Sequence, residues 1–240
     1  MLDWALLLAA LAVAGWGLVT GRSLPARIAA PAGRTSRPHM IRGWALGTAV
    51  TYGGGGIVAL ALLGRVDALR TMPVELRTIA WSLGLPGAAT PAMLAWLAGC
   101  LVVGVSLGAG IVAARHRLGR RPFGRVYHSP AAARGRGERA PAALLALSAG
   151  VSEELFFRLT IPLLCASAFG SGTFGMALSL AVFTALHRHQ GWFGMAAVAL
   201  VGAWLTYLYL LTGALWLVML LHILIDLHAL VLRPRLPPSS

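Results

Sequence analysis

The sequence predicts an all-α membrane protein, a polytopic helix bundle of about seven transmembrane helices. Hydrophobic residues make up 58% of the chain and charged residues only 11%, whereas soluble domains carry roughly 25% charged residues. The apolar residues form separate runs, most of them close to the roughly 20 residues that a membrane-spanning helix needs. No change in composition marks a separate soluble domain. We therefore expect the chain to form one membrane-embedded unit.

Seven apolar segments carry this prediction, at 2–20, 43–64, 92–114, 141–168, 172–187, 194–212 and 214–232. The first begins with Asp3 and no arginine, unlike the start of a cleaved signal peptide, so we interpret it as the first span. We group the segments as three N-terminal helices within 1–140, a four-helix core at 141–232 and a short cytoplasmic tail at 233–240.

Two longer connections separate the N-terminal segments. The 65–91 connection contains three prolines and predicts a short interfacial or re-entrant helix around 74–85. The 115–140 connection is rich in arginine, glycine and proline, so we expect a solvated cytoplasmic connector there.

The basic residues predict the orientation of the bundle. All 20 basic residues are arginine, and 16 of them fall on the cytoplasmic side if the N-terminus lies outside and the C-terminus inside. The arginines are not interleaved with aromatic residues on one surface, so we expect no nucleic-acid partner. Arginine without lysine, together with abundant glycine, favours a bacterial cytoplasmic (inner) membrane protein.

Small residues within the apolar segments predict close helix packing. Gly53 to Gly56 lie in the second segment, and Gly104 and Gly108 form a small-xxx-small pair in the third. A phosphate-binding loop would need a following Gly-Lys-Ser/Thr, which is missing. Cys100 and Cys165 lie in apolar runs and indicate buried small hydrophobic side chains rather than a disulfide framework.

Charged residues in the fourth segment indicate a functional site. Glu153, Glu154 and Arg158 lie in an apolar run, where each ionised group costs about 3 kcal/mol to insert. Glu154 and Arg158 are four residues apart, so we expect them to form an ion pair. Glu153 points about 100° away and lacks that partner, which makes it the expected general base. Pro162 has no N–H and predicts a kink or a freed carbonyl at Arg158.

Two later segments carry histidines. His187 ends the fifth segment beside Arg188, and we expect it to lie nearer the membrane surface than the carboxylates. His222 and Asp226 are four residues apart in the last segment, so Asp226 is expected to hydrogen-bond His222 and fix its tautomer. Intramembrane acids and histidines in neighbouring segments together predict one polar site.

Three motifs in this order resemble those of the CPBP intramembrane proteases, which include the CAAX-processing endopeptidases and the bacterial Abi proteins. The motifs are Glu153-Glu154-Leu-Phe-Phe-Arg158, Phe183-Thr-Ala-Leu-His187 and His222-Ile-Leu-Ile-Asp226, within about 141–232. The resemblance implies a glutamate-dependent intramembrane endopeptidase without a cofactor.

The resemblance also implies a role for each motif residue. Glu153 and His187 would activate water, while Glu154 and Arg158 would support them. His222 with its i+4 partner would stabilise the oxyanion. Prenyl-processing relatives have Asn where this chain has Asp226, and an ionised Asp accepts hydrogen bonds but donates none. Orientation of His222 is therefore the role that we expect for Asp226.

Two other kinds of protein fit the same residues: a proton-coupled transporter, and a non-catalytic membrane immunity or assembly factor. A zinc protease is a further alternative, but the chain has no His-Glu-x-x-His pair, so we expect no metal. For a peptidase, the expected partners are the lipid bilayer and a membrane-associated peptide or protein that is cleaved near its end.

Overall fold

The computed structural model describes residues 1–20, 23–29, 36–118 and 129–232, and these residues form helices without a strand. The predicted tail at 233–240 lies outside the described residues, as does 119–128 of the basic connection. The N-terminal half contains α1 (Leu2–Thr20), α2 (Ser23–Ala29), α3 (Arg37–Thr48), the π-helical turn η1 (Ala49–Gly54), α4 (Gly55–Leu62), the short η2 (Val66–Leu69), α5 (Val74–Ser82) and α6 (Pro91–Arg117).

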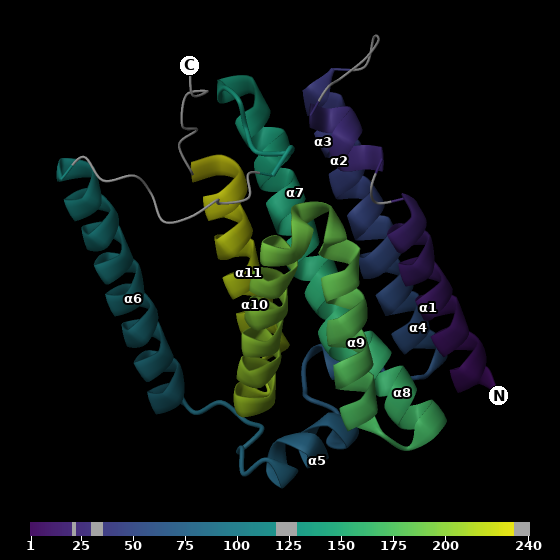
Figure 1. Ribbon diagram of the computed structural model, residues 1–240. Coiled ribbons are helices and arrows are strands. Elements are labelled where there is room, and N and C mark those ends of the chain that lie inside the picture. The colour runs from purple at the N-terminus through teal and green to yellow at the C-terminus, as the bar shows by residue number, and fades with distance from the viewer. Residues whose placement is uncertain (21–22, 30–35, 119–128, 233–240) are drawn as a thin grey trace.

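The C-terminal half has the same all-helical character. It contains α7 (Arg136–Glu154), the π-helical turn η3 (Leu155–Thr160), α8 (Ile161–Phe169), α9 (Gly172–Leu186), the 3₁₀ turn η4 (His187–Gln190), α10 (Gly191–Thr212), α11 (Leu215–Leu227) and the π-helical turn η5 (His228–Leu232). Figure 1 shows the long helices running roughly alongside one another, which confirms the predicted all-α bundle.

The described residues contain six helical runs that are long and apolar enough to cross a membrane. The sequence divides the same residues into seven segments, because α9, η4 and α10 form one continuous run, Gly172–Thr212, that the sequence splits in two. Gly191 has a φ of +73° at the junction, where the chain reverses direction between α9 and α10. The number of spans and their orientation across the membrane remain predictions.

Helix α7 is the centre of the bundle. It packs against α3 on one side and α11 on the other, while α8 packs against α9 and α1 (Figure 1). One apolar cluster joins α4, α5, α8 and α10, and a second joins α1, α8 and α9 around a group of phenylalanines. This packing places η3, where the carboxylate motif lies, in the interior of the bundle.

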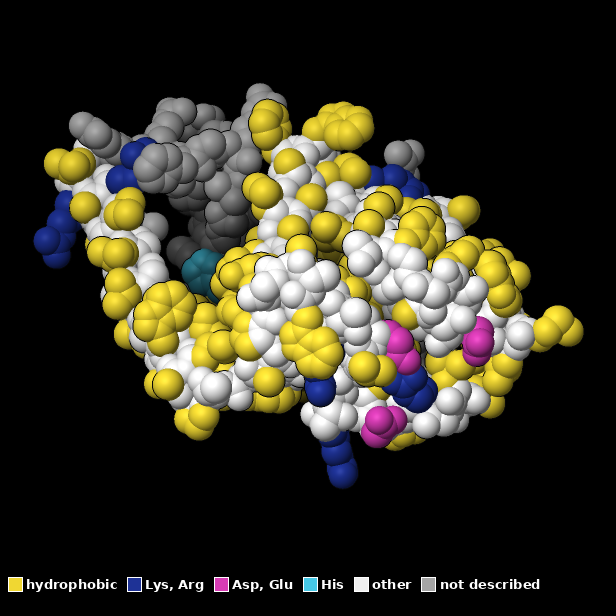
Figure 2. All heavy atoms as spheres, turned by 90° about the horizontal axis from the view of Figure 1, so that it is seen from below, with side chains coloured by type: hydrophobic (Ala, Val, Ile, Leu, Met, Phe, Trp, Pro, Cys, Tyr) yellow, Lys and Arg dark blue, Asp and Glu magenta, His cyan; other side chains and the backbone are white. Residues whose placement is uncertain are grey.

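The outer surface suits a hydrocarbon environment. Large apolar side chains such as Val50, Ile57 and Leu62 point outward along the second span, an arrangement that favours lipid rather than water as the surroundings. Seen from the end where α5 lies, the surface is mainly hydrophobic, with few acidic and arginine side chains (Figure 2). The chain is an integral membrane protein.

Helix α6 stands apart from the other helices (Figure 1), and the apolar window of its span is not buried. No atom of a neighbour lies within 4 Å of the position of a Cβ at Gly104 or Gly108. The predicted close packing of this pair was wrong for the described chain, because the helix has no partner there. Gly53 does meet a neighbour closely, which confirms that packing prediction in the second span.

The two connections differ in how well they were predicted. Helix α5 confirms the short helix expected around 74–85, and Arg65 beside it donates to both carboxylate oxygens of Glu75, at 2.7 and 2.9 Å. This pairing holds the pKa of Glu75 below its ordinary value.

The described part of the 115–140 connection is not simply solvated. Ala131 is fully buried, and Arg37 forms an ion pair with Glu138 at 3.0 Å.

Candidate active site

The helix that carries the carboxylates changes its winding directly after them. Helix α7 ends at Glu154 and continues as the π-turn η3, in which a carbonyl accepts from the N–H five residues later. Five residues after Phe157 comes Pro162, which has no N–H to donate. The hydroxyl of Ser179 donates to the Phe157 carbonyl instead. From the sequence we predicted that Pro162 would leave the Arg158 carbonyl, four residues earlier, without a backbone donor. In the π-turn the carbonyl without a backbone donor is instead that of Phe157, five residues before Pro162.

A glycine brings the third motif close to the first. A Cβ at Gly150 would lie 2.5 Å from Ile223 Cγ1 and 2.7 Å from the Ile223 backbone nitrogen. Real side chains do not reach such distances, so α7 and α11 approach each other this closely only because residue 150 has no side chain. Ile223 follows His222, and the approach therefore carries His222 to the end of α7.

Glu154 is the centre of the buried polar cluster. Its Oε1 lies 2.9 Å from Nη1 of Arg158, which confirms the predicted ion pair. The same oxygen accepts a hydrogen bond from Nδ1 of His222 at 2.6 Å. Glu154 is fully buried and Arg158 nearly so. The carboxylate is thus paired with a guanidinium and an imidazole within the bundle, as a buried charge requires.

The partner of His222 differs from the expectation. We expected Asp226 to fix the tautomer of His222, but Asp226 Oδ2 is 3.7 Å from Nε2, beyond hydrogen-bond distance. Glu154 instead fixes the ring, because its carboxylate accepts from Nδ1–H. The interval of four residues between His222 and Asp226 made a contact between these two side chains possible. The close approach of α7 and α11 places Glu154 nearer to His222 than Asp226 is.

The Phe183 ring packs against Arg158 and lies near both histidines. Its ring centroid is 4.4 Å from the Arg158 guanidinium carbon and 4.7 Å from the His187 ring. The His222 ring stands nearly perpendicular to it at 6.3 Å. A cation over an aromatic face is stabilised by the ring quadrupole. Phe183 therefore stabilises the Arg158 cation of the ion pair and packs against the His187 ring.

His187 has a defined tautomer in its neutral form. Its Nδ1–H donates to the Phe183 carbonyl at 2.8 Å, so Nε2 carries a free lone pair. The expectation that His187 lies nearer the surface than the carboxylates came from its neighbour Arg188. Figure 1 shows the α9–α10 connection closer to the middle of the bundle than the outer ends of α3 and α7. This placement lets His187 reach the level of the other motifs.

One cavity joins the predicted site residues. It has a volume of about 670 Å³, and its lining includes Glu153, Arg158, His187, His222 and Asp226. Glu153 Oε2 lies 4.0 Å from Nε2 of His222, on the same side of the ring as Asp226. Glu154 lies behind this lining, where it is fully buried. The cavity brings together two carboxylates that can accept a proton and two imidazoles that can carry one.

The same residues do not form a metal-binding arrangement. Within the described parts of the chain, no group of three or more histidine, cysteine, aspartate or glutamate side chains is placed to hold a metal ion.

Ser179 and Gly150 were not singled out by the sequence analysis. Ser179, Phe183 and His187 succeed one another at intervals of four, so they share one face of α9. That shared face was a signal that Ser179 belongs to the site. Gly150 lies one turn before Glu154, but nothing in its own segment indicates that α11 would approach it.

Replacing Ser179 with alanine is expected to destabilise the protein by about 1–3 kcal/mol, because the buried Phe157 carbonyl loses its donor. Thermal unfolding in detergent measures the effect. Ser167→Ala, at an exposed serine of α8, is the matched control and should leave unfolding unchanged. Equal melting temperatures for the two variants would contradict the assigned role of the Ser179 hydroxyl.

Fold and cavity together define a polytopic membrane protein with an interior cluster of carboxylate, histidine and arginine side chains. Residues 137–228 match the Rce1-like family, described as type II CAAX prenyl endopeptidase Rce1-like. This part of the chain therefore carries an Rce1-like domain, which confirms the resemblance to the CPBP and CAAX proteases and supports a membrane protease. Neither the curated proteins nor the solved structures compared with this chain gave a match.

Proposed function

We propose that this protein is a glutamate-dependent intramembrane endopeptidase in which Glu153 is the general base. The observation that carries the proposal is that Glu153, His187 and His222 line one cavity although they come from three separate helical segments. A carboxylate able to accept a proton and an imidazole able to donate one, within reach of a single carbonyl, are the groups that hydrolysis of an amide needs.

The proposed reaction begins when the Glu153 carboxylate takes a proton from a water molecule. The resulting hydroxide adds to the scissile carbonyl carbon, and the carbonyl oxygen becomes an oxyanion. His187 accepts a hydrogen bond from the remaining O–H of the nucleophile through its Nε2 lone pair, and this orients the nucleophile. The Glu153 carboxylic acid then returns its proton to the leaving amine as the carbon–nitrogen bond breaks. Glu153 regains its charge at the end of the cycle.

His222 is the proposed oxyanion donor. Its Nδ1–H is engaged by Glu154, so only Nε2 can face the substrate. When both ring nitrogens carry protons, Nε2–H donates to the oxyanion, and Asp226 at 3.7 Å stabilises the charged ring. Arg158 pairs with Glu154 and holds its carboxylate in place beside the histidine. These two residues therefore act through His222 rather than on the substrate.

The proposed substrate is a peptide or protein associated with the membrane, cleaved near one end. The cavity lining that leads toward the polar residues includes Trp44, Trp192 and Phe193, of which the last two are exposed. Such an apolar rim fits a lipid-embedded chain segment better than a freely soluble one. We place the protein in a bacterial cytoplasmic membrane, with the substrate end presented from the cytoplasm.

Purified protein in liposomes that carry a library of membrane-anchored peptides tests the proposal. Mass spectrometry should detect cleavage products near the peptide ends, and their yield should fall when His222 is replaced with glutamine. Proton flux is recorded on the same liposomes. Flux that depends on Glu153 without any cleavage would support the transporter and overturn the peptidase.

Removal of metal ions is expected to leave cleavage within about twofold of the untreated rate, since the proposed base is a carboxylate that needs no metal-bound water. Peptide cleavage is measured before and after dialysis against a chelator, alongside the metal content of the preparation. Loss of activity that is restored by added Zn²⁺ would contradict the metal-free mechanism proposed here.

A further inference from the structure

A second cavity lies where the end of α1 meets the turn between α9 and α10. It has a volume of about 500 Å³, and its lining consists of Leu18, Ala185, Arg188, Gly191, Trp192 and Met195. None of the candidate site residues belongs to this lining. The cavity therefore adjoins the candidate active site without being part of it.

Arg188 is the charged side chain of this lining, and no acidic side chain of the protein pairs with it. All seven acidic residues lie in the parts of the chain that the structure describes. The arginines that pair with them are Arg37, Arg65 and Arg158. The guanidinium of Arg188 is partly buried, and a buried charge needs a partner of opposite sign. The protein's own carboxylates do not supply that partner.

The walls of the cavity are apolar and fixed by helix packing. A Cβ at Gly17 would lie 2.9 Å from a methyl group of Leu186, so α1 and the end of α9 are in direct contact. Their neighbours Leu18 and Ala185 line the cavity together with Met195 of α10. A single cation among apolar walls fits a ligand that joins an anionic group to a hydrocarbon chain.

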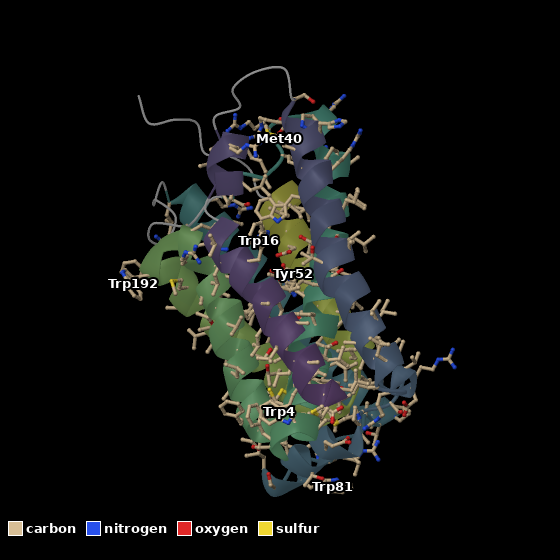
Figure 3. The ribbon with its side chains drawn as sticks, turned by 90° about the vertical axis from the view of Figure 1, so that its right-hand side faces the viewer. Trp4, Trp16, Met40, Tyr52, Trp81 and Trp192 are labelled. Atoms are coloured by element: carbon tan, nitrogen blue, oxygen red, sulfur yellow. The ribbon has the colours of Figure 1, made fainter. Side chains whose placement is uncertain are left out.

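The level of the cavity also fits the headgroup region of a membrane. Trp16 and Trp192 are 71% and 83% exposed, and Figure 3 shows them at similar heights on the side of the bundle that α1 shares with the α9–α10 hairpin. Exposed tryptophans are enriched where a membrane meets water. In the predicted orientation this end of α1 faces the cytoplasmic leaflet, where anionic lipids attract arginine.

We propose that this cavity binds an anionic phospholipid, with the lipid phosphate on Arg188 and an acyl chain along Leu18 and Met195. Lipid binding here is independent of the proposed peptidase function and can be measured in a protein that cleaves nothing. The two sites share a wall, because Gly191 and Trp192 also line the larger cavity.

The Arg188→Gln variant is expected to bind phosphatidylglycerol about tenfold more weakly than wild type, because it loses a charge-assisted contact with the phosphate. Native mass spectrometry of the purified protein in a neutral detergent measures the affinity of the first lipid bound. Arg42→Gln removes an exposed arginine of α3 on the same predicted face and should bind as wild type does. Equal affinities for wild type and Arg188→Gln would overturn the proposal.

A second pair of variants tests the cavity without changing any charge. Ala185→Leu narrows the cavity, so it should weaken phosphatidylglycerol binding although Arg188 remains. Ala181→Leu adds the same volume one turn earlier on α9, at an exposed position outside the lining, and should have no effect. Binding that is lowered equally by both changes, or by neither, would contradict a lipid in this cavity.

Two other ligands test which source of phosphate the site takes. Phosphatidylcholine with the same acyl chains should bind wild type about fivefold more weakly than phosphatidylglycerol, because its choline cation would lie near Arg188. Inorganic phosphate should not displace phosphatidylglycerol, since it cannot use the apolar walls. Equal binding of the two lipids would overturn the preference for an anionic lipid. Displacement by inorganic phosphate would show a site for a free anion instead.

Discussion

The Glu153→Gln variant is expected to lower kcat for peptide cleavage by about 10²–10⁴-fold, the range that a positioned general base contributes. Glutamine keeps the size of the side chain but cannot take a proton from water. Its amide can still contact His222, which lies 4.0 Å from the carboxylate, so folding should be preserved. The measurement is the initial rate of cleavage of a membrane-anchored peptide in liposomes, together with thermal unfolding of the same preparation.

Two further variants serve as controls for the Glu153→Gln measurement. Glu75→Gln removes another glutamate charge, at the partly exposed Arg65 pair beside α5, and should leave kcat unchanged. Glu153→Asp keeps the charge but withdraws it by one methylene, so an intermediate rate is expected. If Glu153→Gln cleaved as fast as wild type, another residue would have to be the base.

The Arg158→Met variant is expected to show the largest loss of stability, about 3–5 kcal/mol. The reason is that Glu154, which is fully buried, would lose the cation 2.9 Å from its Oε1. Methionine fills most of the arginine volume, so the loss would reflect the uncompensated charge rather than a cavity. Thermal or denaturant unfolding in a fixed detergent measures the change.

A matched pair at the protein surface gives the control. Arg65→Met breaks the partly exposed ion pair with Glu75 and should cost no more than about 1 kcal/mol. Adding Glu154→Gln to Arg158→Met should recover much of the lost stability, because it removes the buried charge left behind. Similar losses for Arg158→Met and Arg65→Met would show that the buried pair does not hold the site together.

The features that could be predicted from the sequence are those set by local spacing. The Glu154–Arg158 ion pair follows from an interval of four on one helix, and the helices follow from apolar runs between arginines. The interruption after Glu154 was also predictable, since Pro162 cannot continue an α-helical ladder. Each of these depends on residues within about two helical turns.

The features that were missed depend on how distant helices pack. Glu154 and His222 are 68 positions apart, and their hydrogen bond exists because Gly150 lets α11 approach α7. Spacing within the last segment favoured Asp226 as the partner, although a residue on another helix lies nearer. The isolation of α6 is a second case, because a small-xxx-small pair permits close packing but does not supply a partner.

We propose that Glu153 enables the protein to hydrolyse peptide bonds of membrane-associated substrates. This can be tested in cells by comparing the N-terminal and C-terminal peptides of membrane fractions from cells that express wild type or Glu153→Gln at equal levels. We expect a set of new protein ends that is present with wild type and missing with Glu153→Gln. Identical sets of ends in the two strains would contradict it.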